Sequence, residues 1–145
     1  MKIKDQVCSL ELAVKLHKLG VASPSLFYTD SSKNKNNEIE MWETPDYCQD
    51  NINRYSVAEL GELLPNQIDN GIGEDPSFMH FDYNVIKEDG YMVYIEDFDF
   101  NKEHIEIAKT EANARALMLI YLIENKLLES NSEEQTKVHQ QEESL

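Results

Sequence analysis

The sequence predicts an α+β fold: a small antiparallel sheet, a long C-terminal helix packed on it, and two shorter helices. Three observations predict this class. Leucines recur at helical spacing over residues 9–19, and residues 110–128 carry a long apolar helical pattern. Segments 38–43, 78–83 and 91–95 show the alternation or the composition that is typical of strands.

The first predicted helix runs from Ser9 to Leu19. Its residues Leu12, Leu16 and Leu19 recur at i, i+4 and i+7, so they form one apolar stripe. Ser9 is a favourable N-cap residue, and Gly20 suits the position that follows the last turn. The sequence therefore indicates both where this helix begins and where it ends.

A hairpin with a polar tip is predicted next. Residues 25–29 extend after Pro24, and residues 30–37 contain nothing that favours burial. Residues 38–43 then alternate polar and apolar side chains, as a half-buried strand does. Residues 44–54 contain Pro45, Asp46, Asn51 and Asn53 and are predicted to form a loop.

The second helix begins at Ser56 and ends before Pro65. Ser56 and Glu59 have the spacing of a capping box, in which each side chain accepts a hydrogen bond from the other's backbone N–H. Tyr55 and Leu60 occupy the two positions of a hydrophobic staple. These signals predict the start of this short helix.

Two strands and a further extended segment are predicted in the second half. Residues 66–77 form a loop, and residues 78–83 and 91–95 pair as a hairpin through a turn at Asp89-Gly90. Residues 104–107 can form another short strand.

The last helix is predicted from Thr110, its N-cap, over residues 111–128. At 18 residues it would be about 27 Å long. It is apolar around most of its middle, and one face contains Ala112, Ala116, Ile120, Ile123 and Leu127. Residues 129–145 are polar and acidic and are predicted to be a disordered tail, which leaves one domain over residues 1–128.

The charge of the chain excludes several classes of protein. The 28 acidic and 13 basic side chains give a net charge of −15. Direct nucleic-acid binding and docking on an anionic membrane both need clustered Lys and Arg, so neither is expected. The longest apolar run, residues 116–123, is too short to span a bilayer, and no signal peptide is recognisable. We therefore expect a cytoplasmic protein in which Cys8 and Cys48 are reduced, although a disulfide between them stays open.

One motif resembles the start of a calcium-binding loop but lacks the residues that are diagnostic of such a loop. Asp97, Asp99 and Asn101 match its first three ligand positions. However, Lys102 and Ala108 stand where the loop needs Gly and Glu. We therefore predict no metal site and no cofactor.

Other chemistry has weaker support. His80 and Asp82 share a strand face that His104 could join as zinc ligands, but a surface histidine is the better interpretation. Cys8 precedes a helix that could lower its thiol pKa, although a structural cysteine is favoured. The glycines at 71 and 73 lack the rest of a phosphate-binding loop. No catalytic residue is predicted, and an enzyme with an unrecognised site remains an alternative.

Acidic charge is concentrated in residues 69–106, where eleven acidic side chains stand against Lys87 and Lys102, a net charge of −9. This charge has two interpretations: solubility alone, or a surface that attracts a basic protein partner. The candidate partner-binding residues are Glu96, Asp97 and Asp99. The same segment holds seven aromatic residues: Phe78, Phe81, Tyr83, Tyr91, Tyr94, Phe98 and Phe100.

Three stretches together resemble a family of small proteins encoded by phages, prophages and other mobile elements: CSLELA at 8–13 with LFY at 26–28, YSVAELGELLP at 55–65, and TEANARA at 110–116 with MLIYLIEN at 118–125. The same stretches carry helix caps and apolar faces, so they also specify packing. Within the third, Arg115 either points to solvent or pairs with a carboxylate. The resemblance implies action inside a bacterial host and no known catalytic residues.

The function predicted from these observations is that of a small, acidic, non-catalytic binding protein. One alternative is a nucleic-acid-mimicking inhibitor of a host defence protein, similar to anti-CRISPR proteins. Such an inhibitor would bind its basic target in a salt-sensitive way.

Overall fold

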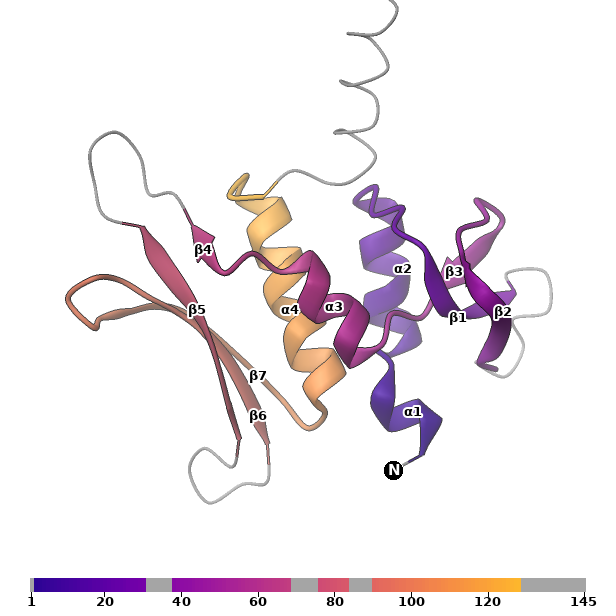
Figure 1. The fold of residues 1–145 in the computed structure, drawn as a ribbon, viewed down its shortest axis with the longest axis horizontal. Coiled ribbons are helices and arrows are strands. Elements are labelled where there is room, and N and C mark those ends of the chain that lie inside the picture. Colours follow the sequence, from indigo (N-terminus) through magenta and orange to yellow (C-terminus); the bar gives the residue numbers. More distant parts are fainter. Residues whose placement is uncertain (1, 31–37, 69–75, 84–89, 129–145) are drawn as a thin grey trace, which may run out of the picture.

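Two antiparallel sheets lie on opposite sides of a central layer of helices (Figure 1). The computed structural model describes residues 2–30, 38–68, 76–83 and 90–128. In chain order the elements are α1 (Ile3–Gln6), α2 (Leu10–Lys18), β1 (Ser25–Asp30), β2 (Glu40–Asp46), β3 (Asn51–Asn53), α3 (Val57–Leu63), β4 (Gln67–Ile68), β5 (Ser77–Tyr83), β6 (Tyr91–Glu96), β7 (Lys102–Ala108) and α4 (Glu111–Glu124). The predicted α+β class is confirmed, with α4 packed on β6 and β7.

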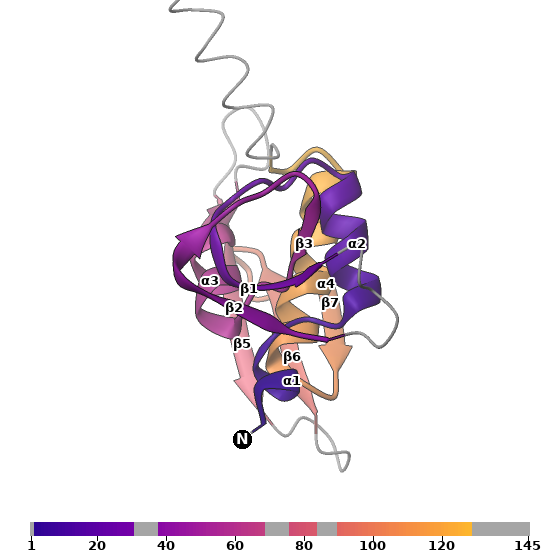
Figure 2. The ribbon, with the colours of Figure 1, turned by 90° about the vertical axis from the view of Figure 1, so that its right-hand side faces the viewer.

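The strands divide between two sheets. The first has the order β2-β1-β3 and the second the order β4-β5-β6-β7, and every neighbouring pair is antiparallel. Figure 2 looks onto the three-stranded sheet, with the helices behind it. The predicted hairpins β1–β2 and β5–β6 both form. β3 pairs with the other edge of β1, where Tyr28 lies opposite Asn53. It is therefore the third strand of the first sheet.

The starts of α2, α3 and α4 are those that the sequence predicts. The Ser9 side chain accepts a hydrogen bond from the Leu12 N–H, and Gly20 follows α2 with a φ of 92°. The left-handed backbone conformation at this position favours glycine, because glycine has no Cβ atom. At α3, Ser56 and Glu59 form both hydrogen bonds of the capping box.

The C-terminal helix is shorter than predicted. α4 has 14 residues, about 21 Å, and ends at Glu124 rather than at Leu128. Lys126 has a φ of 58°, its N–H donates to the Ile123 carbonyl, and the Leu127 N–H donates to the Leu122 carbonyl. These two bonds form a Schellman motif, which satisfies the last carbonyls and turns the chain away from the helix axis.

Three short elements lie where a loop or no element was predicted: α1, β3 within residues 44–54, and β4 within residues 66–77. Strands of two or three residues contain too few positions for an alternating pattern to be visible. Residues 31–37 of the hairpin tip, Asp89 of the predicted turn and the tail 129–145 lie outside the described residues.

The core is built around α4. Seven of its residues are buried, and all seven belong to one hydrophobic cluster. Residues of α2, α3 and β6 also contribute to this cluster. Ile52 of β3 packs against the same cluster, so both sheets border one core. The seven residues are Ala112, Ala114, Ala116, Met118, Leu119, Ile120 and Leu122. No helix in the described part of the chain is long and apolar enough to cross a bilayer.

A buried arginine joins the three-stranded sheet to the helices. The Arg54 side chain is 2% exposed. Its Nε donates to the Cys8 carbonyl at 2.9 Å, and its Nη1 donates to the Thr29 hydroxyl at 3.0 Å. Because a buried charge needs hydrogen-bonding partners, these bonds fix the segment before α2 against β1.

The capping carboxylate of α3 also holds β1. Glu59 Oε1 accepts from the Ser56 N–H at 2.9 Å and from the Ser25 hydroxyl at 2.8 Å. Its Oε2 accepts from the Leu26 N–H at 2.9 Å. One side chain therefore caps a helix and positions the start of a strand that lies more than 30 residues earlier.

Candidate partner-binding site

The four-stranded sheet has two different faces. The helices lie on one side of it (Figure 1), where Val93 and Ile95 of β6 join the core. Side chains alternate along a strand, so Tyr94 and its cross-strand partner Ile105 point to the opposite face. We call this opposite face the outer face. Its exposed apolar side chains are Phe78 (36% exposed), Ile105 (41%) and Ile107 (56%).

Tyr94 lies at the centre of the outer face. The His80 ring stacks on it at a centroid distance of 5.0 Å, and Lys102 Nζ lies 5.0 Å from the centre of the Tyr94 ring. His80 Nε2 is also 3.8 Å from Glu96 Oε1. Charged and aromatic side chains are therefore in contact on this face.

The turn between β6 and β7 has an unusual residue at its third position. The Asp97 N–H donates to the Asn101 carbonyl at 2.9 Å, and the Phe100 N–H donates to the Asp97 carbonyl at 3.0 Å. Phe100 has a φ of 66°. This is a three-residue hairpin loop whose left-handed position normally holds glycine. Phe100 occupies that position with a side chain that is 81% exposed.

Asp97 organises this turn. Its Oδ1 accepts from the Asp99 N–H at 3.0 Å and from the Asn101 N–H at 2.8 Å. Its Oδ2 accepts from the Asn101 side-chain amide at 3.3 Å. Asp is favoured at the first position of such turns because it can make these local bonds.

The structure places the three predicted partner-binding residues at one end of the hairpin but gives them different surroundings. Glu96 is half-buried and faces His80, Asp97 is engaged in the turn, and Asp99 is exposed. The sequence grouped them by charge alone. The turn bonds of Asp97 and the left-handed conformation of Phe100 were not predicted.

A pocket of about 550 Å³ opens beside this turn, and we call it the turn pocket. Phe98 on its wall is 63% exposed. Two carboxylates and three phenylalanines line the pocket, whereas no Lys or Arg is among its described lining residues. The lining residues are Asn66, Phe78, Met79, His80, Glu96, Asp97, Phe98 and Phe100.

The possible zinc ligands do not come together. His80 is on the outer face, whereas the His104 ring stacks on Tyr121 of α4 at a centroid distance of 3.4 Å. His104 Nε2 also lies 3.0 Å from Glu106 Oε1. The Asp82 side chain lies outside what the structure describes. Among the residues that it does describe, no group of three or more His, Cys, Asp and Glu side chains could hold a metal ion.

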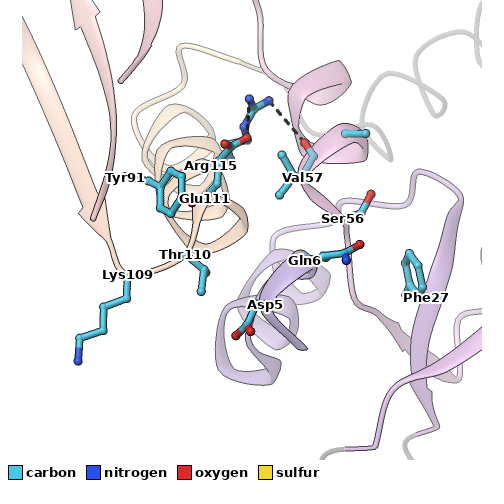
Figure 3. A pocket seen from close by; sticks show the side chains of 11 residues that line it. Asp5, Gln6, Phe27, Ser56, Val57, Tyr91, Lys109, Thr110, Glu111 and Arg115 are labelled. Atoms are coloured by element: carbon cyan, nitrogen blue, oxygen red, sulfur yellow. Dashed lines mark hydrogen bonds and ion pairs between the residues drawn. The ribbon is translucent and has the colours of Figure 1, made fainter. Parts of the chain in front are cut away.

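A larger pocket, of about 830 Å³, is lined by residues of the helices together with Phe27 of β1 and Tyr91 of β6 (Figure 3). α1, α3 and the start of α4 all contribute to it. Arg115 Nη2 forms an ion pair with Glu111 Oε2 at 2.9 Å, which confirms the carboxylate alternative for this arginine. The hydroxyls of Ser56 and Thr110 cap α3 and α4. These polar groups therefore all have structural partners. The lining residues are Asp5, Gln6, Phe27, Ser56, Val57, Ala58, Tyr91, Lys109, Thr110, Glu111 and Arg115.

Cys8 is a structural residue. It is fully buried, and burial raises the pKa of its thiol to about 12, although the nearby Arg54 charge acts in the opposite direction. The alternative of a reactive Cys8 with a lowered pKa is therefore wrong, because loss of solvation outweighs the favourable charge. Cys8 and the half-buried Cys48 are both free, so the disulfide alternative is also wrong.

Comparison of the chain with protein-family models, with curated proteins and with solved structures finds no match in any of the three. The resemblance to phage and mobile-element proteins therefore stays a prediction. The case for a function rests on the geometry described above.

Proposed function

We propose that this protein is a non-catalytic binding protein that docks a basic protein partner on the outer face and the adjoining β6–β7 turn. The observation that carries the proposal is the pair of exposed phenylalanines, Phe98 and Phe100, on a turn flanked by Glu96, Asp97 and Asp99. The phage-family resemblance supports a partner inside a bacterial host.

Solubility accounts for the charges but not for the phenylalanines. Exposed acidic side chains keep a protein dispersed, whereas exposed aromatic rings lower solubility. Phe98 and Phe100 are 63% and 81% exposed at the tip of a hairpin, where a small polar residue would serve the turn. Aromatic anchors near an interface centre contribute a large share of binding energy. We therefore interpret these rings as anchors.

The charge of the chain suits a basic partner. A net charge of −15 attracts positive surfaces over a distance set by the ionic strength. Glu96, Asp97 and Asp99 concentrate this charge around the rings. Long-range attraction would speed the encounter, and the rings would then hold the complex.

The same geometry favours docking of partner side chains over mimicry of a nucleic acid. A mimic needs a row of free carboxylates that imitates phosphate spacing. At this turn, Asp97 is bonded to the turn backbone and Glu96 faces His80, which leaves Asp99 as the exposed carboxylate of the three. Inhibition of a host defence protein would follow from occupation of that protein's basic surface, not from mimicry of a nucleic acid.

The experiment is capture from a bacterial lysate, followed by affinity measurement with the purified captured protein. The test variants are E96Q/D97N/D99N and F98A/F100A. The matched control is E38Q/E43Q/E62Q, which removes the same charge from exposed positions outside the turn: 38, 43 and 62. Circular dichroism melting checks that each variant folds.

The expected result is a basic captured protein whose affinity falls with added salt and with both test variants, and falls less with the control. The triple amide variant should also lose part of its salt dependence. A captured protein that is acidic, or whose affinity ignores salt and both test variants, would overturn the proposal.

A further inference from the structure

The turn pocket combines features that suit an organic cation. We propose that it receives the side chain of an arginine or lysine from the basic partner, with the charged group over the rings of Phe98 and Phe100 and close to Glu96. This inference rests on the proposed function and names the group that the turn would recognise.

The walls of the turn pocket are largely aromatic. Phe78 comes from β5, whereas Phe98 and Phe100 come from the β6–β7 turn, and all three line the pocket. The face of an aromatic ring attracts a cation placed within about 6 Å of its centre. The apolar surface of the same walls can also pack against the methylene groups that lysine and arginine carry.

The turn pocket also carries negative charge. Glu96 and Asp97 bring two carboxylates to the pocket, and no Lys or Arg is among its described lining residues. The Asp97 oxygens are bonded within the turn, but its negative charge remains. Glu96 is half-buried, and a partly buried carboxylate attracts a cation more strongly than one in bulk water. The pocket is therefore negative as well as aromatic.

The neighbouring part of the outer face already contains a contact between a cation and an aromatic ring. Lys102 Nζ lies 5.0 Å from the centre of the Tyr94 ring. Lys102 also lies opposite Glu96 in the register of β6 and β7. An ammonium group thus lies over an aromatic ring a short way along the same hairpin. The turn pocket offers the ring and the carboxylate without a resident Lys or Arg among its described lining residues.

The backbone conformation of the turn independently indicates a functional site. Phe100 has a φ of 66°, a conformation that is unfavourable for a residue with a Cβ atom and costs glycine little. Its ring is 81% exposed, so packing within the chain does not repay this cost. Strain of this kind is concentrated at functional sites.

The experiment is a titration of the full-length protein followed by amide chemical shifts in 1H–15N spectra. The probes are n-butylguanidinium, n-butylammonium and the uncharged n-butanol. The test variant F98L/F100L keeps the pocket apolar but removes two rings, and E96Q removes one charge. The control I105V/I107V changes exposed residues of the same outer face that do not line the pocket.

Both cations should shift the amide signals of residues 98–100, whereas n-butanol should leave them in place. The F98L/F100L variant should weaken cation binding, by about two- to fivefold for each of the two rings removed. E96Q should weaken binding as well, and I105V/I107V should leave it unchanged. A lower dissociation constant for the guanidinium would identify arginine as the favoured side chain, and a lower dissociation constant for the ammonium would identify lysine.

Two results would overturn the inference while leaving the proposed function standing. Equal shifts with n-butanol would mean an apolar pocket only, and unchanged cation affinity in F98L/F100L would mean attraction by charge alone. Conversely, the cations could bind as expected while the affinity of the purified partner is unchanged in every turn variant. In that case the proposed function fails and the cation pocket remains.

Discussion

The Arg115 guanidinium of α4 lies so close to Gly61 of α3 that a Cβ atom at residue 61 would collide with Arg115 Nη1. Nη1 points toward the Val57 carbonyl at 3.5 Å, and Nη2 pairs with Glu111 at 2.9 Å. Glycine within a helix costs about 1 kcal/mol relative to alanine. The close approach of Arg115 is a physical reason for glycine at this position.

The first prediction concerns this contact. Gly61→Ala should give little or no stabilisation in the wild-type background, because the gain in helix propensity is offset by displacement of Arg115. In an Arg115→Ala background the same change should stabilise by about 1 kcal/mol. Urea unfolding of the four proteins gives the coupling energy as a double-mutant cycle. A coupling near zero would mean that Arg115 moves aside at no cost.

The second prediction concerns the core. Ile120 is 3% exposed on the helix that both sheets border. Ile120→Asp should unfold the domain, because an unpaired buried charge costs several kcal/mol against a total stability of about 5–15 kcal/mol. Circular dichroism melting is the measurement, and Glu124→Asp at the exposed end of α4 is the control. A cooperatively melting Ile120→Asp protein would contradict the placement of the core.

The third prediction separates stability from binding at the turn. Phe100→Gly should leave the free energy of unfolding unchanged or raise it by up to about 1 kcal/mol, because glycine adopts the left-handed conformation at lower cost. The same change should weaken binding of the basic partner. Phe98→Gly is the contrast, since residue 98 does not have a positive φ and glycine there only adds flexibility. A clear loss of stability in Phe100→Gly would show that the ring packs within the chain.

The fourth prediction concerns alkaline pH. Burial raises the pKa of the Cys8 thiol from its ordinary 9.0 to about 12. Below pH 9 the thiol is protonated in both states. Above pH 9 the unfolded chain loses this proton and the folded chain keeps it, so stability should fall by about 1.4 kcal/mol per pH unit up to about pH 12.

Urea unfolding between pH 8 and 11 tests this slope. Cys8→Ala should give a shallower decrease than wild type, and Cys48→Ala is the matched control for loss of a thiol outside the core. Tyr55, whose pKa burial also raises, contributes a decrease in the same direction above about pH 10. An unchanged slope in Cys8→Ala would mean that Cys8 ionises as readily in the folded protein as in the unfolded chain.

The sequence by itself determined the fold class and the starts of the main helices. Ser9, Ser56 and Thr110 all cap the helices that they were predicted to cap. These features depend on residues within four positions of one another, so the local order of side chains is enough to specify them. The sequence also located a cluster of charge at Glu96, Asp97 and Asp99.

Only the tertiary structure decided what those residues do. The turn pocket depends on the register that places Phe78 of β5 opposite Glu96 of β6 and next to the β6–β7 turn. The division into two sheets depends on β3 joining β1, and the glycine at 61 has its reason in Arg115, which lies 54 positions later. These relations arise when packing brings distant segments together, and hydrophobic burial and cross-strand pairing select that packing without leaving a pattern at any one point of the chain.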